Sequence, residues 1–346
     1  MKHILLLLIL TFTGSAQDFY VFAGQSNMSG SGKAEDLTIN DLDTEDVWGW
    51  DWAQNKFVTN LNPIANDDVF RAELLHGYTW DRSQKWGCVL EAMRVIRDRT
   101  GEPVYFIKYA WGGSAILPTH NGTTNWTNDL YDTLKTEVSI AGRTPTAFMW
   151  MQGETESITQ ARADQYEILL PDFIDRVKAE ICAGPFISGQ VQLNPLWSYA
   201  EQVRALQLSL NQSGDLKLVS SDDFRTYIDD PAHFDAVSLR KLGLKFALQA
   251  LYGHTTTNSK AYIETCGDYN GDGHIDALWV MRSGSDKLFK AWRMENYVVK
   301  GQDNIYWNGS VMDRINDSFR FVNSVDVDND NDDDIYHTDD AGNHHI

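Results

Sequence analysis

The chain has 346 residues, of which 42% are hydrophobic and 12% aromatic, so it can bury the core of one large domain or two and is not disordered over most of its length. Its formal net charge of −20 argues against nucleic-acid binding, because a phosphate backbone attracts basic surfaces. The three cysteines, Cys88, Cys182 and Cys266, are too few for a disulfide framework, and we expect Cys88 and Cys182 to be small buried residues without a catalytic role.

Residues 1–16 have the pattern of a secretory signal peptide. Lys2 and His3 precede an apolar run over 4–12, and the small residues of 14–16 follow it. The run is well short of the roughly 20 residues that a membrane-spanning helix needs, so a membrane anchor is the weaker alternative. We therefore expect a mature chain that begins near Gln17, has no membrane span and is secreted or periplasmic.

A short apolar run over 19–23 predicts a buried strand, and the sequence Gly24-Gln-Ser-Asn-Met28 follows it directly. This places Ser26 at a strand-to-loop corner and makes it the leading candidate for a nucleophile, although a serine before a helix is also a common N-cap. A serine hydroxyl attacks an acyl carbon only when a base removes its proton and donors hold the oxyanion. The motif therefore requires partners elsewhere in the chain.

Short apolar runs alternate with segments of helical period from 18 to 251, which predicts parallel strands joined by helices in a doubly wound α/β sheet. The segment 36–81, with Trp48, Trp50, Trp52 and Trp80, is predicted to be an irregular insertion beside the site. The predicted strands are 19–23, 104–109, 147–151, 186–192 and 217–220, and the predicted helices are 86–99, 159–180 and 236–251, with Pro171 a candidate for a break or kink in the second helix.

Two more motifs follow predicted strands. Gly112-Gly113 comes after 104–109, and Gln152-Gly153-Glu154 comes after 147–151. Open α/β sheets build their ligand crevices beyond the carboxyl ends of their strands, so we expect both motifs to lie near Ser26.

An acid and a histidine precede the last predicted helix. Asp230 comes three residues before His233, and together with Ser26 they supply the carboxylate, imidazole and hydroxyl of an acyl-transfer triad. The alternative is that His233 is an ordinary loop histidine. Its position after Asp230 and before Phe234 and an apolar helix favours the catalytic interpretation.

The polar stretch 255–262 is predicted to be a linker between a domain at 17–254 and a second region at 263–346. Two acidic loops in that region carry oxygen side chains at positions one, three, five and nine, which favours structural Ca²⁺ over a solvated turn with no ion. Neither loop has the Glu at position twelve of an EF-hand, and a β-hairpin is predicted over 277–292. The predicted ligands are Asp268, Asn270, Asp272, the His274 backbone and Asp276 in the first loop, and Asp326, Asp328, Asp330 and Asp334 in the second.

The order Gly-Gln-Ser-Asn-Met, Gly-Gly, Gln-Gly-Glu and Asp-x-x-His resembles the SGNH (GDSL-like) hydrolases, and within them the sialate O-acetylesterase-like branch that includes carbohydrate esterase family six. The resemblance covers roughly the first three quarters of the mature chain. The acidic loops resemble the FG-GAP or VCBS repeats of calcium-binding β-propellers. Only two such repeats fit, so this second region would be an incomplete or small accessory module.

The resemblance implies a serine carbohydrate esterase that removes O-acetyl groups from a substrate such as acetylated xylan or acetylated sialic acid, with no cofactor for catalysis. Protein partners remain unknown. The alternatives are a non-catalytic carbohydrate-binding or adhesion protein with an inactive α/β domain, and an SGNH lipase or thioesterase. The intact triad residues argue against the first of these.

The resemblance also implies roles for single residues. The oxyanion donors would be the Ser26 amide, a glycine amide of Gly112-Gly113 and the side chain of Gln152, where the broader superfamily has Asn. The glycines are equally explained by a tight turn. Asp230 would orient the histidine, with Glu154 as the alternative acid because some members use that glutamate; Glu154 could instead cap the next helix. Aromatic side chains suit sugar stacking, although they more often belong to the core; the predicted substrate contacts are Gln25, Asn27, Trp111 and Trp126.

Overall fold

The structure of the protein is a computed structural model that describes residues 18–59, 61, 85–118 and 125–253, and beyond these the strands between 262 and 345. Past residue 253 it describes these strands by their backbone, together with the buried side chain of Cys266. The predicted signal peptide at 1–16 lies outside the described residues, so it stays a prediction.

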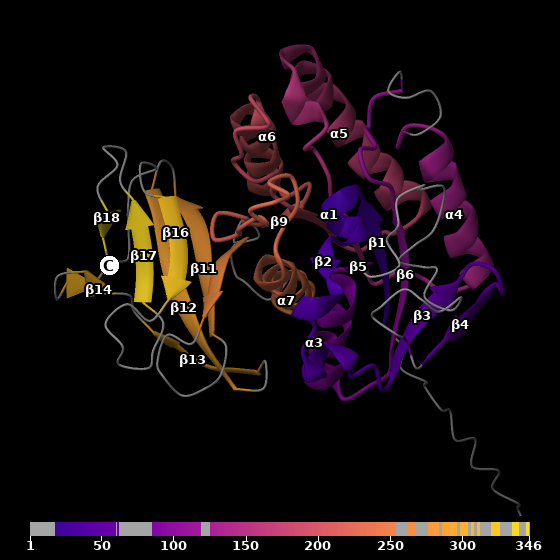
Figure 1. Cartoon of the computed structure of the whole chain (residues 1–346), viewed down its shortest axis with the longest axis horizontal. Helices are drawn as coiled ribbons and strands as arrows, with labels where there is room; N and C mark the ends of the chain where they lie inside the picture. The colour runs from indigo at the N-terminus through magenta and orange to yellow at the C-terminus, as the bar shows by residue number, and fades with distance from the viewer. Residues whose placement is uncertain are drawn as a thin grey trace, which may run out of the picture.

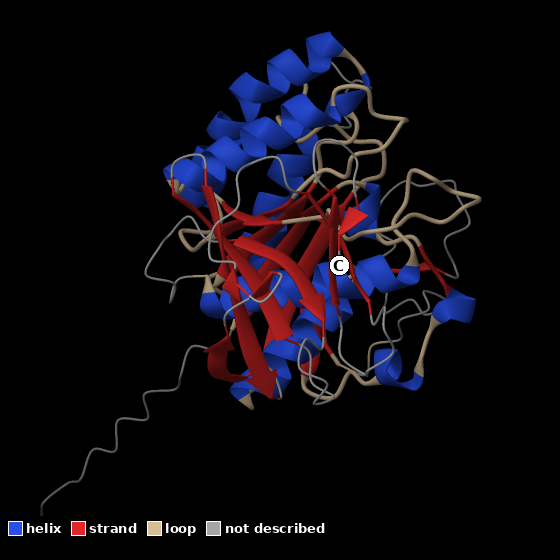
Figure 2. Cartoon of the chain, turned by 90° about the vertical axis from the view of Figure 1, so that its left-hand side faces the viewer, coloured by secondary structure: helices blue, strands red, loops and turns tan. Residues whose placement is uncertain are grey.

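A mostly parallel sheet runs through the centre of the molecule, with helices on both sides (Figure 2). Strand β1 (Phe19–Gly24) lies between β6 (Val104–Ala110) and β7 (Ala147–Met151) and pairs in parallel with both. On the β7 side, β8 (Phe186–Gly189) and β9 (Lys217–Val219) continue the sheet in parallel. The three strands that precede the predicted site motifs are therefore direct neighbours, and their carboxyl ends lie at one edge of the sheet.

Successive residues of β1 face opposite sides of the sheet, as the period of a strand requires. Phe19, Val21 and Ala23 join one hydrophobic core, whereas Tyr20 and Phe22 join the other. Helices on both faces confirm the predicted doubly wound α/β class. The first core is covered by α4 (Asp129–Ala141), α5 (Gln160–Glu180) and α6 (Ala200–Ser213), and the second by α3 (Val89–Thr100) and α7 (Ala236–Tyr252) (Figure 1).

The predicted strands and helices are confirmed, with shorter strands at two places. β8 ends at Gly189 and β9 ends at Val219, so both are shorter than their apolar runs. The first predicted helix begins later, at Val89, because Lys85–Trp86 forms β5 and pairs with Gly32–Lys33, which is β2. Helix α5 continues through Pro171 without a break. The prediction that Cys88 and Cys182 are buried is confirmed, and neither forms a disulfide.

The prediction that 36–81 is irregular is wrong for its middle part. Val47–Asp51 forms β3, which pairs in parallel with β6, and Lys56–Val58 forms β4 at the outer edge of the sheet. The indole of Trp50 packs edge to face on Phe57 with the ring centroids 5.0 Å apart, so the tryptophans here build the edge of the core. Two short 3-10 helices precede β3, η1 (Ala34–Asp36) and η2 (Ile39–Leu42), while Trp80 lies outside the described residues.

The C-terminal strands extend the same sheet. β10 (Tyr262–Gly267) pairs in parallel with β9 through Ile263 and Val219, and the antiparallel strands β11 (Asp276–Ser283), β12 (Asp286–Glu295) and β13 (Val298–Asp303) follow. The predicted hairpin is thus confirmed as β11 and β12. Two smaller sheets hold the remaining strands, β14 (Tyr306–Trp307) with β15 (Ser310–Val311), and β16 (Arg320–Val325) with β17 (Asp334–Thr338) and β18 (His344–His345).

The predicted calcium loops fall mainly outside the described residues. Residues 268–275 and 326–333 are not described, and Asp276 and Asp334 are described only as the first backbone positions of β11 and β17. Most of the predicted linker lies outside as well. The division into domains at 254 and 263 and the calcium ligands therefore stay predictions.

Candidate active site

Ser26 begins the short helix α1 (Ser26–Ser29) directly after β1. Gly24 is required before it, because its φ is +148° and a Cβ at this position would lie 2.0 Å from the backbone oxygen of Met151. The backbone amide of Gln25 donates to that same oxygen at 2.9 Å. The close approach of β1 to β7 therefore fixes the point at which the chain turns, and it places Ser26 beyond the strand end.

A cavity of about 280 Å³ opens at this end of the sheet. It is lined by residues that follow three neighbouring strands and by residues of the loop before α7, as expected for the crevice of an open α/β sheet. Ser26 and His233, which are far apart in the sequence, both line it. The full lining is Gln25, Ser26, Gly112, Gly113, Glu154, Thr155, Ile158, Trp197, Ala232 and His233.

The side chains of His233 and Asp230 form a close pair. Nδ1 of the imidazole lies 2.7 Å from Oδ2 of Asp230, and the His233 amide donates to the Asp230 backbone oxygen at 3.1 Å. The three-residue spacing thus closes a tight turn that brings the carboxylate to Nδ1. In this arrangement Nδ1–H donates to Asp230, which leaves Nε2 as the basic nitrogen of the ring.

Glu154 lies in a different environment. Its Oε1 accepts a hydrogen bond from Asn27 Nδ2 at 2.8 Å, and its Oε2 is buried with no partner among the described residues. Burial raises the pKa of this carboxyl to about 7, against the smaller lowering effect of the Asn27 hydrogen bond. The structure therefore pairs the imidazole with Asp230 and not with Glu154, the alternative acid.

Gln152 does not reach the cavity, which corrects its prediction as an oxyanion donor. It is fully buried, and its Nε2 donates to Glu156 Oε2 and lies 3.3 Å from Gln25 Oε1. The sequence analysis missed Glu156, whose Oε1 also accepts from the Ile116 amide at 2.6 Å. Burial raises the pKa of Glu156 to about 7. A second glutamate two residues after the Gln-Gly-Glu motif was the available signal.

Gln25 is the residue whose side-chain amide lies at the cavity. Its Oε1 is within 3.3 Å of Gln152 Nε2 and 3.4 Å of the Thr155 amide. These two contacts fix the oxygen on the protein side of the planar amide, so Nε2 faces the cavity that Gln25 lines. Gly112 and Gly113 line it too, in agreement with their predicted position.

The other predicted substrate contacts are not among the residues that line the cavity. Asn27 and Trp126 are both fully buried, and Trp126 donates its indole N–H to Ser114 Oγ at 3.0 Å within the core. Trp111 is partly buried and packs against the same core. Instead, Trp197 and Ile158 line the cavity, and no motif in the sequence marked them. Each of these two residues follows a predicted strand, but it belongs to no sequence motif that would predict a place in the site.

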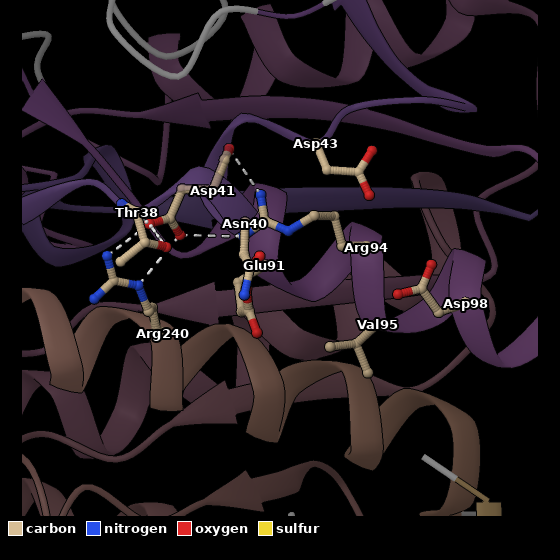
Figure 3. Close-up of a pocket in the computed structure, with 9 residues that line it drawn as sticks. All are labelled: Thr38, Asn40, Asp41, Asp43, Glu91, Arg94, Val95, Asp98 and Arg240. Carbon is tan, nitrogen blue, oxygen red and sulfur yellow. Dashed lines mark hydrogen bonds and ion pairs between the residues drawn. The ribbon is translucent and has the colours of Figure 1, made fainter. Parts of the chain in front are cut away.

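A second cavity of about 410 Å³ lies between η2, α3 and α7. Figure 3 shows Asp41 between two guanidinium groups, and its carboxylate accepts from Arg240 at 2.6 Å and from Arg94 at 3.3 Å. Burial acts to raise the pKa of Asp41, but the hydrogen bonds from Arg240 and Thr38 hold this pKa below its usual range. This network fastens α7, which follows His233, to the segment that follows the nucleophile.

Among the described residues, no helix is long and apolar enough to cross a membrane, and no cluster of three or more His, Cys, Asp or Glu is arranged to hold a metal ion. The second finding does not bear on the predicted calcium loops, since these lie outside that part of the chain.

Residues 16–252 match the family model described as carbohydrate esterase, sialic acid-specific acetylesterase. A search of curated proteins finds no match. Among solved structures, a protein from Arabidopsis thaliana is 18% identical, with a TM-score of 0.56 over 68% of this chain and 98% of its own. A carbohydrate acetylesterase from Xanthomonas citri is 15% identical, with a TM-score of 0.51 over 94% of this chain and 71% of its own. At these identities the two structures show the shared fold.

Proposed function

Because the chain belongs to the sialic acid-specific acetylesterase family of carbohydrate esterases, we propose that it removes O-acetyl groups from a carbohydrate by a serine acyl-enzyme mechanism. The observation that supports this most strongly is the 2.7 Å contact between Asp230 and the His233 imidazole in a cavity that also contains Ser26. Those three groups are the base, its orienting acid and the nucleophile that acyl transfer requires.

In the first half of the reaction, the Ser26 hydroxyl oxygen attacks the acetyl carbonyl carbon while Nε2 of His233 accepts the hydroxyl proton. The tetrahedral intermediate then collapses. The bond from the acetyl carbon to the sugar oxygen breaks, and the imidazolium gives its proton to that oxygen. Asp230 stabilises the imidazolium through Nδ1 throughout.

In the second half, a water molecule attacks the acetyl-Ser26 ester and His233 takes a proton from the water. Collapse of the second intermediate releases acetate, and the proton returns to the Ser26 oxygen. The products are acetate and the deacetylated sugar, so the protein needs no redox partner or cofactor for this balance.

The oxyanion requires donors at the cavity. We assign the Ser26 backbone amide to this role, since the first amides of a helix have no intrahelical partner, together with the Gly112-Gly113 segment. For the side-chain donor we propose Gln25 in place of Gln152, because Gln152 Nε2 donates to Glu156 and Gln25 Nε2 faces the cavity.

The test compares acetate release from acetylated xylan and from acetylated sialic acid by the wild-type protein and by Ser26→Ala. We expect the wild type to release acetate from one of them and the variant to lose at least about 10³-fold in kcat. Equal activity of the two proteins would reject Ser26 as the nucleophile. The comparison of the two substrates decides between a polysaccharide and a sialic acid.

Two further parts of the proposal rest on sequence alone. We propose that residues 1–16 direct export, which N-terminal sequencing of protein from the culture medium or periplasm would test by finding Gln17 or a close neighbour first. We also propose structural Ca²⁺ in the loops at 268–276 and 326–334. Elemental analysis of native protein that finds no bound calcium would reject it, and chelation should lower the melting temperature without changing turnover.

A further inference from the structure

Asn27 and Phe234 each follow a proposed catalytic residue by one position, Asn27 after Ser26 and Phe234 after His233. The backbone amide of Phe234 donates to Asn27 Oδ1 at 3.0 Å. This is a direct bond between the turn that carries the nucleophile and the loop that carries the base. Both residues are fully buried, so water does not compete for the contact.

Glu154 fixes the orientation of the Asn27 amide from the other side. Asn27 Nδ2 donates to Glu154 Oε1 at 2.8 Å. With the nitrogen held toward Glu154, the oxygen must face the Phe234 amide. Two consecutive hydrogen bonds therefore link the end of β7, helix α1 and the His233 loop.

Phe234 is held at its carbonyl as well. Ser31 Oγ donates to this oxygen at 3.1 Å, so the segment after the nucleophile binds both polar backbone groups of Phe234. The Phe234 ring packs edge to face on Phe224 with the ring centroids 5.0 Å apart. The backbone next to His233 is thus located against the backbone next to Ser26 and is not free to shift by itself.

We propose that Asn27 is a positioning residue that sets the Ser26 hydroxyl against the His233 imidazole, with Glu154 holding the Asn27 amide in the required orientation. The inference rests on the proposed function and deepens it, because it gives Glu154 a role other than the acid partner of the imidazole. Asn27 does not touch the substrate, since it is fully buried. A misplacement of about 1 Å between reacting groups costs about 10²-fold in rate.

The experiment exchanges donor and acceptor in the Asn27–Glu154 contact of the full chain. Asn27→Asp keeps the acceptor for Phe234 but sets a second carboxyl oxygen against Glu154. When Glu154→Gln is added, the amide nitrogen of the new glutamine side chain can donate to the carboxylate at position 27, so the hydrogen bond is restored with donor and acceptor exchanged. We expect kcat for 4-nitrophenyl acetate to fall about 10-fold to 100-fold in Asn27→Asp with little change in KM, and to recover to within about 3-fold in the double variant.

Asn211→Asp is the matched control, because Asn211 is also fully buried and its Oδ1 accepts from a backbone amide, that of Leu218, at 3.0 Å. It should lower the melting temperature and leave kcat unchanged. Titration of Ser26 with a fluorophosphonate counts competent sites, so kcat is expressed per folded molecule. If Asn27→Asp does not fold, Asn27→Ser, which keeps an oxygen acceptor, is measured in the same way and should show the same loss.

Two results would overturn the inference: an Asn27 variant with wild-type kcat, or a double variant that is no faster than Asn27→Asp. Either result would leave the esterase function intact, provided that the wild type is active. A wild-type protein that cleaves no acetyl ester would instead overturn the proposed function itself.

Discussion

The two halves of the site are held in place by different forces. The strand-end half, which comprises Ser26, Gly112-Gly113 and Glu154, follows three buried parallel strands. The loop half, with Asp230 and His233, lies on an irregular segment where the Asp230 side chain is 40% exposed, whereas Glu154 is buried. The nucleophile is therefore located by the core of the fold, whereas the base is located by polar contacts and by one buried neighbour, Phe234.

Those polar contacts join the loop half to the segment after the nucleophile. Tyr227 donates its hydroxyl proton to Asp36 at 2.7 Å, and Lys33 forms an ion pair with Asp229 at 3.0 Å. The Lys33–Asp229 pair is exposed, and an exposed ion pair contributes little to global stability. We infer that changes in the loop half alter catalysis with little effect on unfolding, and that changes in the strand-end half alter both.

The largest effect should come from Asp230→Asn in the loop half. The asparagine amide has one acceptor oxygen and no charge, so it no longer stabilises the imidazolium of His233. We therefore expect kcat to fall by about 10³-fold to 10⁴-fold. Because Asp230 is partly exposed, the melting temperature should stay within a few degrees of the wild type. Steady-state kinetics and thermal denaturation check the two parts. A large loss of stability would contradict the contrast between the halves.

Gln25→Glu should have the next largest effect on rate, in the strand-end half. Glutamate keeps the oxygen that faces Gln152 and Thr155 but loses the donor that faces the cavity. Loss of one oxyanion donor costs about 10²-fold to 10³-fold in kcat. Gln152→Glu is the comparison, because the same change there removes a donor to Glu156 and should reduce stability more. If kcat fell only in the Gln152 variant, the assignment of Gln25 would be wrong.

Glu154→Gln should change how stability depends on pH. The carboxyl has a pKa of about 7 in the folded protein and an ordinary value of 4.5, so the folded state holds a proton that the unfolded state releases between these values. The wild type therefore loses stability as the pH rises from 4.5 to 7, on the order of 3 kcal/mol from this group. Urea unfolding across this range should show a smaller decline for the variant. Parallel curves for the two proteins would contradict the raised pKa.

The smallest effect should follow Lys33→Met. This change removes the ion pair with Asp229 and the contact of Nζ with the Tyr227 ring, whose centroid lies 4.6 Å away, but keeps an unbranched side chain. An exposed pair contributes little to stability, so both Tm and kcat should change little, and less at high salt. A loss of activity above about 10-fold would show that this one pair positions the loop half.

The sequence predicted the strand-end half well because each motif follows a short apolar strand, and neighbouring parallel strands end at one edge of a sheet. It predicted the Asp230–His233 pair from spacing within one turn. It could not predict that Gln152 is bonded to Glu156, because this depends on which way a buried amide points. For the same reason it placed Asn27 and Trp126 at the substrate, although packing in three dimensions buries both of them.

The edge strands were missed for a related reason. Val47–Asp51 joins the sheet only because β6 offers a free edge, and nothing in a tryptophan-rich segment indicates that partner. Trp197 reaches the cavity from a loop and Ile158 from the end of a short 3-10 helix, η4 (Glu156–Ile158), and the paths of both connections depend on α5 and α6. Residues at the ends of strands and pairs within one turn were therefore predictable, whereas contacts that depend on the path of a connection were not.

The pairing of β10 with β9 has a practical consequence for anyone who trims this protein. Without the strands from Tyr262 onward, β9 would lose the partner that it pairs with through Val219 and Ile263, and it would become the last strand of the sheet. Such an open edge recruits strands from other copies of the chain. A truncated esterase ending at Gly253 should therefore form aggregates in storage even while its catalytic groups are intact.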